Sequence, residues 1–220
     1  MCYQGKSFSE LVDEWWSWAL LNIAVLENKD GSQCALGQPF SPRSNVFFLA
    51  GLGFGGSSIT RTECHAPENK FLFFPFITVN YGIFPVVEPG PDYWRRTFTN
   101  PLINNVNSLS FTFDGQEGTI PGGGSGFTYS EPETADLFAY RGQSPPGGGV
   151  FDFSAAYGPD LCDTCPADLI LPGVSDGYWL LLAPPSPGEH ELKFSAVAAS
   201  ETLSLRQNVT YNPLTIVGSD

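Results

Sequence analysis

The chain has 220 residues, enough for one large domain with a substantial core, and its net charge is −13. Such a charge argues against nucleic acid or an anionic membrane as a partner, because phosphate binding needs a basic face. Charged residues make up only 15% of the chain, whereas 24 glycines and 19 prolines favour short strands joined by tight turns. We therefore expect a mainly β protein: a single antiparallel β-sandwich, immunoglobulin-like or jelly-roll-like, with one N-terminal amphipathic helix.

The helix is predicted over residues 7–28, which begin with the capping-box sequence SFSE and continue with helical apolar periodicity. At about 100° per residue, Trp15 lies near the centre of the apolar arc, and Trp16 and Trp18 lie on its opposite flanks. We therefore expect Trp15 to be almost fully buried. If Trp16 or Trp18 touches a ligand or a neighbouring chain, that residue should keep an exposed edge.

Strands follow the helix, and several alternate apolar with polar residues, as half-buried antiparallel strands do. Others, such as FLFF and YWLLL, are apolar throughout and suit the interior of a sandwich. No break in composition divides the chain, so we expect an extension over 1–6 and a single domain over 7–220. The predicted strands are 45–51, 70–79, 107–115, 149–155, 177–183, 190–198 and 208–217.

Two catalytic motifs occur literally but in the wrong structural setting. Gly51, Gly53 and Gly56 match a dinucleotide-binding fingerprint, yet no helix is predicted after them, so a glycine-rich loop is favoured. The sequence around Ser175, GVSDG, matches a nucleophile elbow, but we read LPGVSDG as a loop that precedes a strand, which reverses the required order. His190, at the entry to a strand, is one of only two histidines that could act as the base.

The five cysteines suggest disulfide bonding rather than metal binding. Cys34 and Cys64 flank an apolar strand region, so a bridge between them would tie the helix–strand connection to the next loop. Cys162 and Cys165 form CDTC, for which a small disulfide loop is favoured over a zinc site, because no second pair is present. Cys2 is left over, either free or paired between chains.

Acidic residues concentrate in the second half of the chain, and Asp160, Asp163 and Asp168 lie close together around CDTC. Calcium prefers carboxylates and loop carbonyls, so these residues are candidate ligands of a structural calcium. A solvated acidic surface is the alternative, and no other cofactor is expected.

Aromatic residues outside the helix offer a second kind of site. Tyr93, Trp94 and Arg95 lie in a predicted loop, where a tryptophan beside guanidinium groups can stack on a ligand such as a sugar. Trp16 is a further candidate for this ligand-binding surface. The alternative is that the loop aromatics cap the sandwich core, and Trp179, within an apolar strand, is expected to be core.

The compartment is predicted to be extracellular or the cell surface. The cysteines and a glycosylation triplet beginning at Asn208 favour export, although no signal peptide is visible. No stretch reaches about 18 uninterrupted apolar residues, so no transmembrane segment is predicted.

Several blocks together resemble a set of secreted bacterial proteins with no established activity. They are the Trp-rich helix, VFFLAG, TRTEC, FFP, YRGQSP, DGYWLLLAPPSPGEHELKF and VTYNPLTI. The resemblance implies export and a Cys34–Cys64 bridge, and it transfers no catalytic residue. The block PSPGEHELKFSAVA also resembles the end of many immunoglobulin-like modules.

Two functions remain. The first is a non-catalytic extracellular protein that binds surfaces or glycans, or assembles into homo-oligomers or filaments by exchanging residues 1–6 or the C-terminal strand. The second is a secreted polysaccharide hydrolase or carbohydrate-binding module, in which Glu131, Glu133 and Asp136 could supply the acid and the base.

Overall fold

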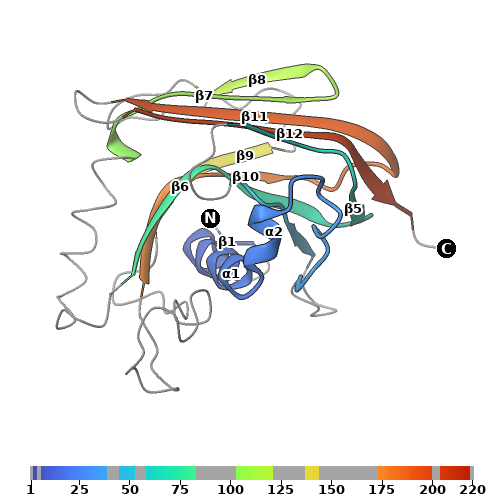
Figure 1. Cartoon of the computed structure of the whole chain (residues 1–220), viewed down its shortest axis with the longest axis horizontal. Helices are drawn as coiled ribbons and strands as arrows, with labels where there is room; N and C mark the ends of the chain where they lie inside the picture. The colour runs from blue at the N-terminus through green and yellow to red at the C-terminus, as the bar shows by residue number, and fades with distance from the viewer. Residues whose placement is uncertain are drawn as a thin grey trace.

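The computed structural model describes residues 2–3, 6–38, 45–52, 58–82, 103–120, 137–143, 173–199 and 204–218. Over these residues the protein is mainly β, with two large sheets and few helices, which confirms the predicted class. The elements lie in three layers (Figure 1): the helices, then a four-stranded sheet, then a six-stranded sheet.

The region predicted as one helix over 7–28 is helical, but it is divided into α1 (Phe8–Leu21) and α2 (Ile23–Glu27), so its predicted continuity is wrong. The break is at Asn22, whose backbone leaves helical geometry at φ −128° and ψ 51°. Its side-chain amide donates a hydrogen bond to the carbonyl of Trp18 at 2.8 Å. Asparagine side chains compete for backbone partners in this way, which explains the interruption. Ahead of α1, β1 (Cys2–Tyr3) pairs with β2 (Lys6–Ser7).

The four-stranded sheet is the middle layer, and both of its faces are buried. Phe74 and Leu180 pack into a core shared with the six-stranded sheet, whereas Phe73 and Trp179 pack into a second core beneath the helices. This arrangement explains why FLFF and YWLLL are apolar at every position. In spatial order the strands are β3 (Val46–Phe48), β6 (Phe71–Gly82), β10 (Gly173–Leu182) and β9 (Leu137–Gln143).

The six-stranded sheet is the outer layer, and β12 is one of its interior strands, with partners on both sides. β12 pairs antiparallel with β11 and parallel with β4 and β5. The C-terminal strand is therefore not an unpaired edge, which corrects the prediction that it is available for exchange. The strands are β4 (Ser58–Arg61), β5 (Cys64–Pro67), β7 (Val106–Phe113), β8 (Gln116–Ile120), β11 (Gly188–Ala199) and β12 (Ser204–Val217).

Strand β10 begins earlier than predicted, because Gly173 to Gly177 belong to the strand and not to a loop. These residues pair with β6, from Gly173 opposite Gly82 onward. Gly177 is required there, since a Cβ at this position would lie 2.6 Å from the carbonyl oxygen of Ile77. The register shifts just beyond it, opposite Pro75, which cannot donate to the ladder.

The turn after β7 was predicted as the end of the strand 107–115. Asp114 and Gly115 instead have φ values of 50° and 75°, the positive values that a two-residue type I′ hairpin needs. The chain then returns as β8, which pairs with β7. The predicted strands 45–51, 70–79, 177–183, 190–198 and 208–217 correspond to β3, β6, β10, β11 and β12, and 149–155 lies outside the described residues.

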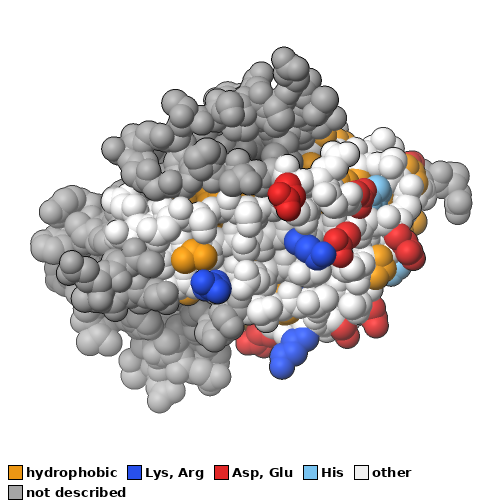
Figure 2. Space-filling view, turned by 90° about the horizontal axis from the view of Figure 1, so that it is seen from above, with side chains coloured by type: hydrophobic (Ala, Val, Ile, Leu, Met, Phe, Trp, Pro, Cys, Tyr) orange, Lys and Arg blue, Asp and Glu red, His pale blue; other side chains and the backbone are white. Residues whose placement is uncertain are grey.

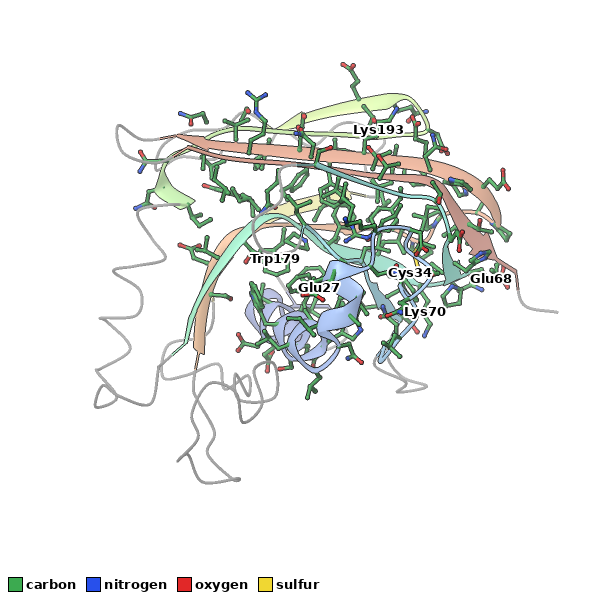
Figure 3. All side chains as sticks on the ribbon, in the orientation of Figure 1. Glu27, Cys34, Glu68, Lys70, Trp179 and Lys193 are labelled. Atoms are coloured by element: carbon green, nitrogen blue, oxygen red, sulfur yellow. A yellow bond between two sulfur atoms is a disulfide. The ribbon has the colours of Figure 1, made fainter. Side chains whose placement is uncertain are left out.

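The tryptophans of α1 form the centre of the second core. Trp15 is 2% exposed, which confirms its predicted burial, and its indole N–H donates to the carbonyl of Leu49 at 2.9 Å. Trp18 is 4% exposed, and its indole donates to the carbonyl of Leu36. Trp179, predicted to be core, is fully buried between the four-stranded sheet and the helices (Figure 3). Its ring stacks on Phe73 with centroids 5.2 Å apart.

Candidate functional site

Most of the predicted site residues lie outside the residues that the structure describes. Within the described ranges, no group of three or more His, Cys, Asp or Glu side chains is arranged to hold a metal ion. The ligand-binding loop, the calcium site, the second disulfide and the acid–base pair therefore stay predictions. The residues concerned are Tyr93, Trp94, Arg95, Glu131, Glu133, Asp136, Asp160, Cys162, Asp163, Cys165 and Asp168.

Trp16 is described, and its position corrects the prediction that it belongs to a ligand-binding surface. Its side chain is only 5% exposed, contrary to the exposed edge expected of a residue that stacks on a ligand. Its ring packs edge-on against Trp15, with centroids 5.1 Å apart. The aromatic cluster thus joins the helices to the sheet rather than facing a partner.

The outward side of the six-stranded sheet carries an extended array of polar side chains. In β7 and β11 the inward residues, such as Phe111 and Phe194, enter the shared core, and the residues between them point outward. We call this surface the outer face. It comprises Ser58, Thr60, Ser108, Ser110, Thr112, Lys193, Ser195, Asn208 and Thr210, all exposed or half-buried.

Strand register arranges most of the outer face in two rows. The first row runs Ser110, Ser195, Asn208 and Ser58, and the second runs Thr112, Lys193, Thr210 and Thr60. From standard sheet geometry, neighbours within a row are about 5 Å apart and the rows are about 7 Å apart. Ser110 and Ser195 are close enough to share a hydrogen bond between their hydroxyls, at 2.7 Å. We call these the hydroxyl rows.

The outer face carries a few charges of both signs, since strand register also places the exposed Glu117 of β8 and Arg206 of β12 on this side of the sheet. Lys193 projects from the outer side of the sheet (Figure 3), and its ammonium group donates to the carboxylate of Glu191 at 2.7 Å. Asn212 donates to the other oxygen of the same carboxylate at 2.6 Å. Figure 2 looks onto this side of the molecule, where uncharged polar surface separates a few acidic and basic side chains. The hydroxyl rows therefore match a neutral polar partner better than a strongly charged one.

Asn208, the predicted glycosylation site, lies within the first hydroxyl row. It is half-buried on β12, between Ser195 of β11 and Ser58 of β4. Glycosylation there stays a prediction, and a glycan at this position would cover the outer face.

A second polar cluster lies at the turn that joins β7 to β8. The imidazole Nδ1 of His190 is 2.7 Å from Oδ2 of Asp114, and its Nε2 is 2.7 Å from the carbonyl oxygen of Ser186. The remaining oxygen of Asp114 accepts the backbone N–H of Glu191 at 2.9 Å. The ring of His190 also stacks on Phe113. We call these groups the His190 cluster.

The His190 cluster shifts the proton affinity of both members. Burial alone would lower the pKa of the His190 imidazole, but hydrogen bonds to Asp114 and Ser186 outweigh burial and raise that pKa above its ordinary value. Burial likewise works to raise the pKa of the Asp114 carboxyl, yet its bonds to His190 and Glu191 hold it below its ordinary value. Both shifts favour the ion pair over the neutral pair of side chains.

The described geometry also bears on the nucleophile-elbow motif. Ser175 is buried inside β10, in a continuous strand rather than a strand–turn–helix elbow. His190 has an acceptor at each ring nitrogen, so neither nitrogen is poised to take a proton from a serine hydroxyl. These two residues therefore do not reproduce the arrangement that serine hydrolysis needs.

The predicted disulfide between Cys34 and Cys64 is present, with Cα atoms 5.5 Å apart. It ties the segment after α2 to β5, across 30 residues of sequence.

The side chain of Gln38 pairs with the edge of β3 in the way that a neighbouring strand would. Its side-chain amide donates to the carbonyl of Phe48 at 2.7 Å and accepts the N–H of the same residue at 2.9 Å.

Replacing both Cys34 and Cys64 by alanine should lower the free energy of unfolding by about 2–4 kcal/mol, because the bridge restricts the unfolded chain over a loop of this length. Urea titration followed by tryptophan fluorescence measures the loss. Reductant should destabilise the wild-type protein and have much less effect on the double variant. A loss below about 1 kcal/mol would show that the bridge adds little to stability.

Comparisons with protein-family models, with curated proteins and with solved structures find no match to this chain. Within the described residues, neither helix is long and apolar enough to cross a membrane.

Sequence reasoning did not identify the hydroxyl rows or the Asp114–His190 pair. Part of the signal was present, since the Ser and Thr residues of NSLSFTF alternate with apolar residues that turn inward. The pairing of Ser110 with Ser195, however, joins residues 85 positions apart and depends on strand register. The dipeptide Asp114-Gly115 is a strong hairpin signal that would have predicted β8.

Proposed function

We propose that this protein is a non-catalytic, extracellular surface-binding protein, and that its outer face binds a neutral polymer rich in hydroxyl groups, such as a glycan. The observation that supports this proposal is the pair of hydroxyl rows. The first row offers serine hydroxyls and the Asn208 amide, and the second offers three threonine hydroxyls beside the Lys193 ammonium. The hydroxyl and amide groups can both donate and accept hydrogen bonds. Single contacts of this kind are weak in water, so affinity would come from many contacts along an extended partner.

Charge supports the choice of a neutral partner. The chain carries a net charge of −13, which disfavours polyanions, and Lys193 on the outer face is already paired with Glu191. The Cys34–Cys64 disulfide is compatible with an oxidising compartment outside the cell. A structural calcium at Asp160, Asp163 and Asp168 and a homo-oligomeric state stay separate predictions, and glycan binding by the outer face requires neither.

For the fold we infer a β-sandwich of immunoglobulin-like or jelly-roll-like type with an N-terminal amphipathic helix. The two large sheets contribute to one shared core, in which Phe74 of β6 packs on Phe194 of β11 with ring centroids 4.7 Å apart. Such a fold provides a rigid, outward-facing sheet, which suits the binding of an extended surface.

Co-sedimentation with insoluble cellulose and chitin, compared with anionic alginate gel, tests the proposed function. We expect the protein to bind a neutral polymer, and Ser110→Arg to weaken that binding about tenfold, roughly 1.4 kcal/mol. This substitution places a long charged side chain in the first hydroxyl row. Gln33→Arg is the matched control, because Gln33 is exposed in the turn region after α2 and lies outside the outer face.

Three results would count against the proposal. One is no binding to either neutral polymer, and another is equal loss of binding in Ser110→Arg and Gln33→Arg. The third is concentration-dependent oligomerisation in sedimentation velocity that Ser110→Arg abolishes, which would assign the outer face to self-assembly instead.

A further inference from the structure

The His190 cluster connects the turn after β7 to the start of β11 and to the connection just before it, which lie more than 70 residues further along the chain. Asp114 belongs to the turn between β7 and β8, Ser186 to the connection between β10 and β11, and His190 to β11 itself. The backbone strengthens the junction, because the N–H of Asp114 donates to the carbonyl of Glu191 at 2.9 Å, and the N–H of Glu191 returns to the Asp114 carboxylate. The imidazole is therefore the bridge between the hairpin turn and the β10–β11 connection.

Only the doubly protonated ring satisfies this bridge. A neutral imidazole has one N–H donor and one acceptor nitrogen. Since a carboxylate oxygen faces Nδ1 and a carbonyl oxygen faces Nε2, the neutral ring would direct a lone pair at one of these oxygens. The imidazolium donates to both, and its contact with the carboxylate is a charge-assisted hydrogen bond.

We propose that the His190 imidazolium is a proton-dependent latch that fastens the β10–β11 connection to the β7–β8 hairpin. Loss of its proton releases one of the two contacts and loosens this end of the six-stranded sheet. The inference is independent of the proposed function, since it concerns the mobility of the hairpin and not the binding of a partner.

The other charged groups around the cluster do not replace the imidazolium. Glu191 follows His190 on β11, but its carboxylate is engaged by Lys193 and Asn212. On the β12 side, the strand partner of His190 is the apolar Leu214, and on the β7 side its ring rests on Phe113. Among the described residues in contact with the ring, Asp114 is thus the one that carries an opposite charge.

The pH window follows from the two shifted pKa values. His190 has a raised pKa, so its contribution is fully present below about pH 6.5, the ordinary imidazole value, and is lost as the pH rises through the raised pKa. Asp114 has a lowered pKa, so its contribution is present above about pH 3.9 and is lost as the pH falls through the lowered value. The latch is therefore closed between these limits. It opens on the alkaline side as His190 loses its proton, and at low pH as Asp114 gains one.

Histidine NMR titration combined with amide hydrogen exchange tests the latch. The variant His65→Gln leaves His190 as the only histidine of the two in the chain, and His65 is exposed on β5. We expect His190 to titrate above about pH 6.5. Across the same midpoint, the protection factor of the Glu191 amide, corrected for intrinsic exchange, should fall on the order of tenfold. The amide of Lys193, two residues further along β11, should keep its protection.

Adding Asp114→Asn to the His65→Gln protein tests the contribution of the Asp114 negative charge. Asparagine also adopts positive φ and keeps an oxygen for the Glu191 N–H, so the turn is retained while the ion pair is lost. The His190 midpoint should then fall to or below its ordinary value, and Glu191 should be less protected already at pH 6.

The proposal is overturned if His190 titrates at or below about pH 6.5 in the His65→Gln protein, or if Glu191 protection stays constant through a raised midpoint. If His65→Gln does not fold, the same readouts on the wild-type protein apply, with His190 assigned by the resonance that His190→Gln removes.

Discussion

Trp15→Ala should lower the free energy of unfolding by about 3–5 kcal/mol, the cost of removing a large aromatic side chain from a packed core. Trp15 is 2% exposed and lies edge-on to Trp16, Trp18 and Trp179, with ring centroids between 5.1 and 5.9 Å away. Its indole also donates to the carbonyl of Leu49, just beyond β3. Alanine would leave a cavity at the junction of α1 and the four-stranded sheet, and an acceptor without its donor.

Urea unfolding followed by far-UV circular dichroism measures this loss without relying on the fluorescence of the residue that is removed. Leu21→Ala is the matched control, because Leu21 lies on the same helix but is 65% exposed, and its replacement should change stability by less than about 0.5 kcal/mol. Trp15→Phe should fall between the two, since it keeps an aromatic ring and loses the N–H donor. Equal free energies of unfolding for Trp15→Ala and Leu21→Ala would show that Trp15 does not hold α1 on the four-stranded sheet.

How far the sequence predicts the fold depends on whether a pattern is local. Helical periodicity placed Trp15 in the core, and alternation identified β7 and β11, because both patterns are complete within one element. The break at Asn22 depends on one side-chain hydrogen bond within otherwise continuous periodicity. The apolar runs in β6 and β10 indicated burial, but their assignment to a middle layer required the helices to cover the second face.

Short strands without an apolar pattern were not predicted. The strand SITR of β4 is mostly polar, and the strand CHAP of β5 ends in proline. Both exist because β12 offers them a parallel partner about 150 residues further along the chain. The candidate site has the same limitation. The outward residues of each strand can be predicted from alternation, but the match of Ser195 with Ser110 and Asn208 is a property of register.

Arg61 is the clearest feature that depends on tertiary structure, since nothing in SITR indicates a buried cation. Its side chain is 1% exposed, and its guanidinium group donates to main-chain carbonyls on both sides of the helix–sheet junction. The acceptors are the oxygens of Leu26, Asn28, Ala50 and Gly51, at 2.9 to 3.4 Å. Within the described residues the guanidinium donates four hydrogen bonds to these carbonyls, which offset much of the cost of burying its charge, and its planar shape suits such a cradle.

Tyr211 completes the Arg61 environment. Its ring lies 5.3 Å beneath the guanidinium carbon, and its hydroxyl donates to the carbonyl of Ala50 at 2.8 Å. Burial raises the pKa of Tyr211, so the phenol stays neutral and contributes a ring face and a donor rather than a charge. Arg61 on β4 and Tyr211 on β12 thus hold the end of α2 and the segment after β3 against the six-stranded sheet.

Arg61→Met should therefore lower the free energy of unfolding by about 3–5 kcal/mol, because methionine fills part of the volume but leaves several buried carbonyls without a donor. Arg61→Lys should lose less, since it keeps the charge, but an ammonium group cannot reach acceptors spread across the plane of the guanidinium. Arg206→Met is the matched control, as Arg206 is exposed on β12. The measurement is urea unfolding of the three variants beside the wild-type protein. If Arg61→Met proved as stable as Arg206→Met, the carbonyls around Arg61 would be solvated or rearranged at no cost, and the junction between helices and sheets would not depend on this guanidinium.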